Sequence, residues 1–186
     1  TGISFGSANG TLYGNAVQLW PMTAYKVWAN NSGGSVEIYF NLTVNDQLPT
    51  LSYTITDLTL TKGEQSTDLP LDPTLTGPGV ITSWEMIGIL PNGLNFGTNN
   101  GTIWGIPSQL QTTGVVYTIW ANNTGGATSA SITITVNDVA PGSFEYIPEN
   151  NSITKNSLTH IAPTYVNLST GNGMTWQVST TATNPG

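Results

Sequence analysis

The sequence of 186 residues contains no cysteine and very little charge. Without cysteine, neither disulfides nor thiolate chemistry can operate in this chain. Only 7% of the residues are charged, whereas about 25% is usual for a globular protein. The 3 basic and 10 acidic residues give a formal charge of −7. We therefore expect no nucleic-acid partner, because phosphate contacts require clustered lysine and arginine.

Long hydrophobic runs are also missing. No stretch approaches the roughly 18 apolar residues of a membrane span, so we expect no membrane insertion in this segment. There is no signal-peptide pattern, and Thr1 is not a natural start, which suggests a piece of a longer or processed chain. No amphipathic helical pattern occurs either.

The sequence contains no recognisable set of catalytic residues. The single histidine, His160, has no nucleophile or orienting acid beside it, although both are needed for nucleophilic hydrolysis. Asp68 and Asp72 flank a proline-rich loop and do not form a recognisable carboxylate pair. We therefore expect no enzyme activity, no catalytic residues and no organic cofactor.

A long internal repeat organises the chain. Residues 25–34 read YKVWANNSGG and residues 117–126 read YTIWANNTGG, and each leads into a strand that ends in Thr-Val-Asn-Asp. Residues 2–46 align with 93–138 at an offset of 91, which becomes 92 after one inserted residue. A period of about 92 residues is the size of one β-sandwich module and is too long for a solenoid repeat.

The rest of the period recurs more weakly. Residues 51–62 correspond loosely to 143–155, and Ser83-Trp84 corresponds to Thr175-Trp176. The chain is therefore divided into three parts: the second half of an Ig-like module at 1–46, a complete module at 47–138, and the first half of a module at 139–186.

Each divided end needs a complement. Half a sandwich cannot bury an adequate core, and its open strand edges are ready to pair with another chain. Two explanations remain open. Either the parent chain is a longer array that supplies the missing halves, or the C-terminal half of one subunit completes the N-terminal half of the next, which gives a head-to-tail filament.

The complete module reads as β-structure throughout, so we predict an all-β Ig-like sandwich. Residues 131–136 alternate strictly, which places Ile132, Ile134 and Val136 in the core. The Asn-Gly dipeptides at 9–10 and 100–101 are typical of hairpin turns. Seven strands are predicted, at about 51–55, 58–61, 80–87, 94–96, 102–104, 115–121 and 128–136.

Three motifs carry a family likeness. LPNGLNF at 90–96, GTIWGIP at 101–107 and YTIWANN at 117–123 resemble the Ig-domain family He_PIG, which is related to cadherin-like, dystroglycan-type modules of large bacterial or archaeal surface proteins. The likeness covers 47–138 and 2–46 and is weaker over 139–186. It implies an extracellular or cell-surface location, but no particular ligand, because fold does not fix function.

The resemblance favours a structural function. It implies a component of a fibre, stalk or filament built from tandem Ig-like domains, with copies of itself or neighbouring Ig-like modules as partners. The alternative is an adhesin module that binds glycans or a cell-surface protein.

Calcium is a candidate ligand at the module junctions. The Asn-Asp-x-x-Pro segments at 45–49 and 137–141 are similar to the linkers of cadherins, in which carboxylates from two modules bind Ca²⁺. In the simpler alternative, Asn-Asp only ends a strand and starts a turn. The candidate ligands are Asp46, Asp57, Asp138 and Glu149.

Glycans are a second candidate modification. The chain contains seven Asn-x-Ser/Thr sequons, which in an exposed turn could accept a glycan. In an Asn- and Thr-rich sequence, several also arise by chance. The candidate positions are Asn9, Asn30, Asn41, Asn100, Asn122, Asn150 and Asn167.

Tryptophans suggest either core packing or sugar stacking. Trp28, Trp84, Trp104 and Trp120 lie at repeat positions on predicted strands, where a buried tryptophan is common, so we predict core positions for them. Trp20 has no counterpart in the second copy, where Gln111 stands. It is therefore the best candidate for an exposed contact.

Overall fold

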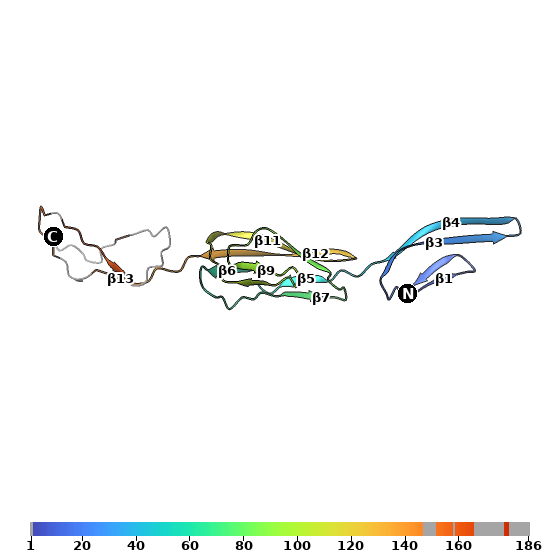
Figure 1. Cartoon of the computed structure of the whole chain (residues 1–186), viewed down its shortest axis with the longest axis horizontal. Coiled ribbons are helices and arrows are strands. Elements are labelled where there is room, and N and C mark those ends of the chain that lie inside the picture. Colours follow the sequence, from blue (N-terminus) through green and yellow to red (C-terminus); the bar gives the residue numbers. More distant parts are fainter. Residues whose placement is uncertain (1, 147–151, 158, 166–176, 179–186) are drawn as a thin grey trace, which may run out of the picture.

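The computed structural model describes residues 2–146, 152–157, 159–165 and 177–178, and all regular structure within them is strand. No segment in those ranges forms a helix that could cross a membrane. The strands, shown in Figure 1, are β1 (Ile3–Gly6), β2 (Thr11–Gly14), β3 (Trp20–Asn31), β4 (Gly34–Val44), β5 (Thr50–Tyr53), β6 (Asp57–Thr61), β7 (Pro73–Thr76), β8 (Ser83–Ile87), β9 (Leu94–Phe96), β10 (Ile103–Gly105), β11 (Gln111–Asn123), β12 (Gly126–Asn137), β13 (Phe144–Glu145) and β14 (Thr164–Tyr165).

A two-layer sandwich occupies the middle of the chain. One layer is a four-stranded sheet in the order β6-β12-β11-β8, in which β6 runs parallel to β12 and the other pairs are antiparallel. The other layer contains the pairs β5-β7 and β9-β10, and a bridge between Leu71 and Ile103 connects Leu71 to β10. Figure 1 shows β11 and β12 above β5, β7 and β9.

The core lies between these layers. Ile132, Ile134 and Val136 are fully buried, as their alternation predicts. Tyr117 and Ile119 on β11 extend the same buried row. The second layer and β6 cover this row with seven further buried or nearly buried side chains: Leu51, Tyr53, Leu58, Leu60, Leu69, Leu71 and Leu94.

The N-terminal strands repeat the pairing of the second half of this sandwich. In the β1-β2 pair Ile3 lies opposite Gly14, as Leu94 lies opposite Gly105 in β9-β10. In the β3-β4 pair Tyr25 lies opposite Phe40, as Tyr117 lies opposite Ile132 in β11-β12. Each N-terminal pair is a two-stranded sheet of its own. The division of the chain into one whole and two half modules stays a prediction.

The strand prediction differs most from the structure at three places. It omitted β7, because Pro73 and the Gly77-Pro78 pair leave only three residues between turn signals. It also started β8 at residue 80, whereas the strand begins at Ser83, and it made β11 too short at both ends. The Asn-Gly turns are present, and Gly10 and Gly101 adopt φ values of 71° and 74°.

Candidate interaction groove and module junction

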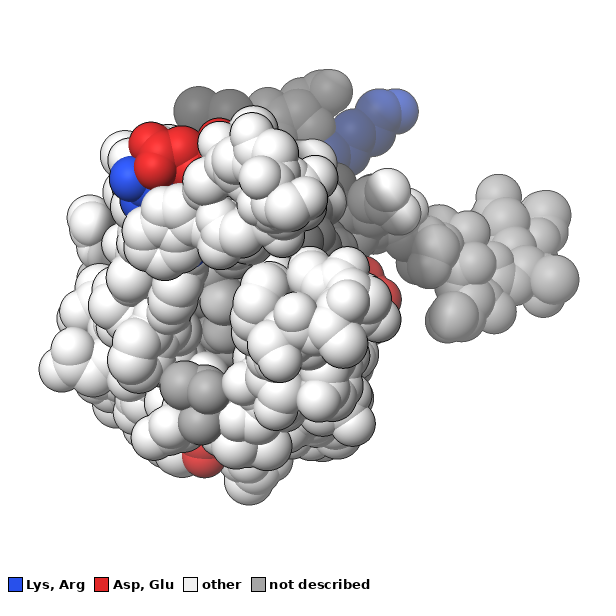
Figure 2. Space-filling view, turned by 90° about the vertical axis from the view of Figure 1, so that its right-hand side faces the viewer, with Lys and Arg blue, Asp and Glu red and all other residues white. Residues whose placement is uncertain are grey.

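An open hydrophobic groove lies between the two N-terminal hairpins. It has a volume of about 480 Å³, and Lys26 is the single charged residue in its lining. We define the groove by six of its apolar side chains: Phe5, Leu12, Trp20, Tyr25, Phe40 and Leu42. The end of the molecule that carries these hairpins is almost uncharged and is hollowed near its centre (Figure 2).

The groove corresponds to a closed core in the middle module. Leu12, Tyr25 and Leu42 occupy the repeat positions of Ile103, Tyr117 and Ile134, all of which are fully buried. Leu12 is 43% exposed, and Tyr25 and Phe40, whose rings stack with centroids 5.6 Å apart, are only half-buried. The same residue pattern therefore forms a core in one place and a surface in the other.

Two strand edges are open beside the groove. In the middle module, β8 pairs with β11 over Thr118 to Asn122, and β6 pairs with β12 over Thr133 to Asn137. Among the described residues, no third strand pairs with the corresponding backbone of β3 and β4, at 26–30 and 41–45. Unpaired edges of this kind are templates for the addition of a strand.

Trp20 lies in the groove. It opens β3 opposite Val44, and its side chain is half-buried. Its indole Nε1 is buried without a hydrogen-bond partner among the described residues. A buried N–H without an acceptor is costly, so this atom marks a place where a partner could contribute a carbonyl. The predicted contact role of Trp20 stays a prediction.

The β3-β4 hairpin carries a small polar-aromatic cluster around Lys26, which also lines the groove. The Lys26 ammonium forms an ion pair with Glu37 and lies 5.2 Å from the ring centroids of both Trp28 and Tyr39. Hydrogen bonding to Glu37, and then to Tyr39, raises the pKa of Lys26. This arrangement fixes two exposed aromatic rings on either side of one cation.

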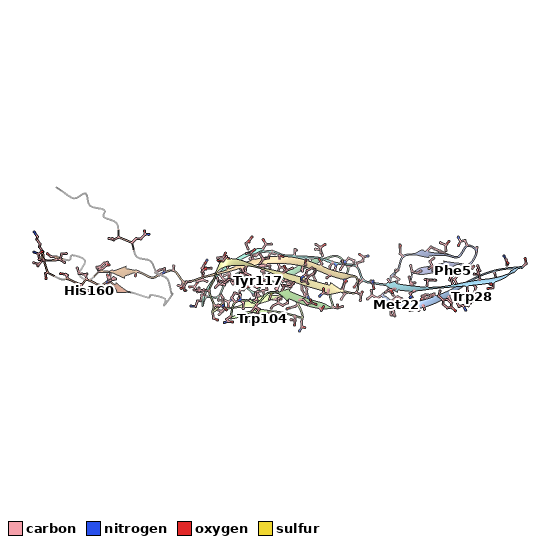
Figure 3. The ribbon with its side chains drawn as sticks, turned by 90° about the horizontal axis from the view of Figure 1, so that it is seen from above. Phe5, Met22, Trp28, Trp104, Tyr117 and His160 are labelled. Atoms are coloured by element: carbon pink, nitrogen blue, oxygen red, sulfur yellow. The ribbon has the colours of Figure 1, made fainter. Side chains whose placement is uncertain are left out.

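Aromatic positions were only partly predicted. Trp84 is buried in the core, as expected, but Trp104 and Trp28 are 42% and 56% exposed, and Trp120 is half-buried. The alternation of β11 already contained the signal, because Tyr117 and Ile119 point inward and Trp120 must then point outward. Figure 3 shows Tyr117 within the middle module and Trp28 near the N-terminal end.

The junction between residues 46 and 48 is held by the tip of the β11-β12 hairpin. The Asp46 amide donates to Thr124 Oγ1 at 2.9 Å, and Asn123 Nδ2 donates to the Gln47 carbonyl at 2.6 Å. The Asp46 carboxylate accepts hydrogen bonds from the amides of Gln47 and Val80, both at 2.9 Å. Asp46 therefore fixes the chain where it enters the middle module.

The predicted calcium ligands are not gathered into one cluster in the described part of the chain. Asp46 lies at the β11-β12 tip, Asp57 starts β6 opposite Thr133, and Asp138 follows the other end of β12. Asp138 Oδ1 accepts a hydrogen bond from the Val139 amide at 3.0 Å. Glu149 lies outside the described residues. The calcium assignment stays a prediction.

The sequons differ in their surroundings. Asn9, Asn30, Asn41 and Asn100 are exposed, whereas Asn122 is half-buried. Asn122 Nδ2, the atom that would carry a glycan, donates to Ser83 Oγ and to Glu85 Oε1 at 3.2 Å each. Asn150 and Asn167 lie outside the described residues. Among the described sites, a glycan would disturb existing contacts most at Asn122.

The residues considered for hydrolysis are apart. His160 is exposed at the C-terminal end of the molecule (Figure 3). Asp72 accepts a hydrogen bond from Thr102 Oγ1 at 2.7 Å and so links the β5-β7 and β9-β10 pairs within one layer of the sandwich. Asp68 is exposed, and its backbone amide donates to Ser66 Oγ at 3.1 Å. These contacts are structural.

Residues 48–137 match the family described as Putative Ig domain (He_PIG). The matched range covers all strands of the sandwich from β5 to β12. The predicted family likeness and the predicted all-β Ig-like fold are therefore confirmed for this part of the chain. No curated protein matches the sequence significantly.

Solved structures with a similar arrangement are multi-domain fragments of Ig and cadherin proteins. They include Sidekick-1 immunoglobulin domains 1–5 (20% identity, 74% of this chain, 30% of that chain, TM-score 0.36). Drosophila N-cadherin EC1-3 has 14% identity over 74% of this chain and 51% of that one, with a TM-score of 0.37. Protocadherin Gamma B7 domains 1–4 has 11% identity over 75% and 47%, with a TM-score of 0.39. The chain thus spans about a third to a half of their lengths.

Proposed function

We propose that this chain, whose residues 48–137 belong to the He_PIG family of Ig domains, is a load-bearing structural segment of an extracellular or cell-surface fibre, stalk or filament. The observation that carries the proposal is the parallel pairing of β6 with β12, the strand at which the middle module ends. The reasons lie in how a pulling force would enter and leave the module.

A pull along the molecule would load this pair in shear. Two parallel strands run in the same direction, and the chain enters β6 at its start and leaves β12 at its end. Tension on the two flanking segments therefore slides the strands past each other lengthwise. Because all hydrogen bonds of the pair then carry the force together, they resist more than bonds opened one after another.

The hydrogen bonds at both ends of the pair are explicit. The Thr133 amide donates to the Thr56 carbonyl at 2.7 Å, and the Lys62 amide donates to the Asn137 carbonyl at 2.9 Å. Between them, Leu58 and Leu60 anchor β6 in the core. Sliding would therefore break the ladder and expose buried leucines in the same step.

The junction at Asp46 supports the same function. A structural spacer must transmit force from one module to the next and keep the orientation of one module relative to the next. A flexible linker would not do so. Here the side chains of Thr124 and Asn123 bind the backbone of residues 46 and 47. These hydrogen bonds thus hold the linker against the end of the module.

Single-molecule pulling on the full chain, attached through both termini, tests this function. Lys62→Pro removes the amide that bonds Asn137, whereas Lys62→Ala keeps it. We expect the proline variant to lower the unfolding force of the middle module and the alanine variant to leave it unchanged. Equal forces for wild type and both variants would contradict a load-bearing β6-β12 pair.

An adhesive function is the second candidate, and the exposed aromatic rings favour it. Trp28 and Tyr39, which are both exposed, flank Lys26 on the β3-β4 hairpin, and aromatic faces can stack on sugars. A glycan array probed with wild type and with Trp28→Ala tests this candidate. Binding that the alanine variant loses would support adhesion, and an array without any binding would remove glycans as the partner.

A further inference from the structure

We propose that the N-terminal groove binds the C-terminal strand pair of a second copy of this chain, so that the two divided halves form one intermolecular Ig-like module. The C-terminal strand pair is defined here as residues 143–146 and 161–165. The inference rests on the proposed function, because it supplies the joint by which such chains would form a filament.

The middle module shows what must cover such a groove. Its β5 and the segment around Leu71 belong to the first half of the module, whereas β9 to β12 belong to the second half. Tyr53 of β5 donates its hydroxyl to the Gly101 carbonyl at 2.6 Å. Leu71 exchanges two backbone hydrogen bonds with Ile103, at 2.9 and 3.0 Å. In the N-terminal hairpins, the repeat equivalents of these two acceptor positions are Gly10 and Leu12.

The C-terminal strand pair has the backbone of the missing first half. In the middle module, Leu51 lies opposite Leu75 and Ser52 opposite Thr74, in the β5-β7 pair. In the C-terminal pair, Phe144 lies opposite Tyr165 and Glu145 opposite Thr164. The register is the same, and aromatic residues replace the two leucines.

The sequence between these strands matches as well. LDPTL at 71–75 corresponds to IAPTY at 161–165, and Tyr53 corresponds to Tyr146 when Leu51 is aligned with Phe144. Ile161 thus takes the place of Leu71, which bridges to β10 in the closed module. Ala162 replaces Asp72, so the bond from Thr102 to Asp72 has no counterpart in the proposed joint.

Both surfaces expose apolar side chains at repeat-equivalent positions of a buried pair. Leu12 is 43% exposed on the groove side, and Ile161 is 40% exposed on the C-terminal side. In the closed module the equivalent pair, Ile103 and Leu71, is buried. The proposed joint places Ile161 of one copy against Leu12 of the next.

One chain cannot close the joint on itself. The N-terminal hairpins and the C-terminal strand pair lie at opposite ends of the middle module (Figure 1). In the proposed joint, a second copy supplies the partner. The groove and the strand pair are different surfaces, so an assembly of any length still has one unoccupied groove at one end and one unoccupied strand pair at the other. The contact therefore propagates head to tail.

Sedimentation velocity of the full chain over a range of concentrations tests the proposal. Wild type should exceed the single-chain mass of 19.6 kDa and grow with concentration. Leu42→Glu places a charge in the groove and should stay at that mass, whereas Thr43→Glu, its exposed neighbour on the same strand, should assemble as wild type does. Ile161→Asp should also stay monomeric, with exposed Thr159→Asp as its control.

Mixing the two non-assembling variants gives the sharpest readout. Leu42→Glu keeps an intact C-terminal strand pair, and Ile161→Asp keeps an intact groove. Their mixture should form a species of two chains and nothing larger. All four variants should melt as wild type does at the middle module, which shows that this module remains folded.

Three outcomes would overturn the joint: wild type that stays at 19.6 kDa at every concentration, Leu42→Glu that assembles like wild type, or Thr43→Glu that fails equally. None of them touches the load-bearing function, because the pulling experiment measures the middle module alone. If wild type, Lys62→Pro and Lys62→Ala unfolded at equal force while the chain still assembled, the load-bearing function would be rejected and the joint would remain supported.

Discussion

Tyr53 on β5 links the β5-β7 pair to the turn that precedes β10. Its ring is buried, and its hydroxyl donates to the Gly101 carbonyl at 2.6 Å. Burial, and then the nearby Asp72 carboxylate, raises the pKa of the Tyr53 phenol well above its usual value. The folded protein therefore favours the neutral phenol.

This raised pKa predicts a loss of stability at alkaline pH. Its contribution is fully present below the unfolded-state pKa of about 10 and is lost as pH rises above it, because the unfolded chain then releases the proton and the folded chain does not. Tyr53→Phe removes both the proton and the hydrogen bond. It should cost about 1 kcal/mol at pH 7 and show a weaker decline above pH ~10.

Urea unfolding of wild type and Tyr53→Phe from neutral to alkaline pH measures both effects. The informative quantity is the difference between the unfolding free energies of the two proteins at each pH. A difference that stays constant across the range would contradict the role of the Tyr53 phenol.

At the scale of single elements, the sequence predicted those strands whose side chains alternate without interruption. Ile132, Ile134 and Val136 were placed in the core by this rule, and they are fully buried. The strand β7 was missed because its Thr74-Leu75-Thr76 core is too short to show a period. Trp104 and Trp120 were misplaced because the prediction followed the frequent burial of tryptophan in sandwich cores and did not apply the alternation of the strands to them.

The candidate groove was predictable in outline, and the junction was not. The repeat aligned residues 2–46 with only the second half of the middle module. An incomplete core in residues 2–46 was therefore predictable from the sequence alone. The contacts of Asp46 did not follow, because Val80 and Thr124 are 34 and 78 residues away in the chain. Only the folded hairpin brings them together.

The junction makes a prediction for Asp46→Ala. The substitution removes the carboxylate that accepts the Val80 amide, and a hydrogen bond to a charged group contributes about 1.5–3 kcal/mol. Hydrogen exchange at the Val80 amide should therefore accelerate by about tenfold or more. Asp57→Ala is the matched control, because Asp57 lies away from Val80 on β6 and should leave that amide unchanged.

At the scale of the whole molecule, most of the hydrogen bonds and the core depend on uncharged groups. The chain has 13 charged residues in 186, from 3 basic and 10 acidic ones. Lys26–Glu37 is the one ion pair identified among the described residues. The stability of the module should therefore depend little on screening by salt.

The hydrogen bonds of Asp46 bear on the predicted calcium binding. The Asp46 carboxylate already accepts two backbone amides, so a bound cation would have to displace existing hydrogen bonds. We expect the melting temperature of the full chain to be the same with Ca²⁺ and with EDTA. A clear decrease in EDTA would show instead that Asp46, Asp57, Asp138 or Glu149 contributes to a calcium site.

The clamped entry at Asp46 also sets a length scale. β12 contains 12 residues and spans roughly 40 Å at about 3.3 Å per residue, and the short linker at 45–49 adds a little more. If successive modules enter one another as the N-terminal hairpins enter the middle module here, the axial step would be constant at on the order of 45 Å. A fibre of such units would have a regular axial repeat, and the Fourier transform of its averaged micrographs would contain a layer line at that spacing.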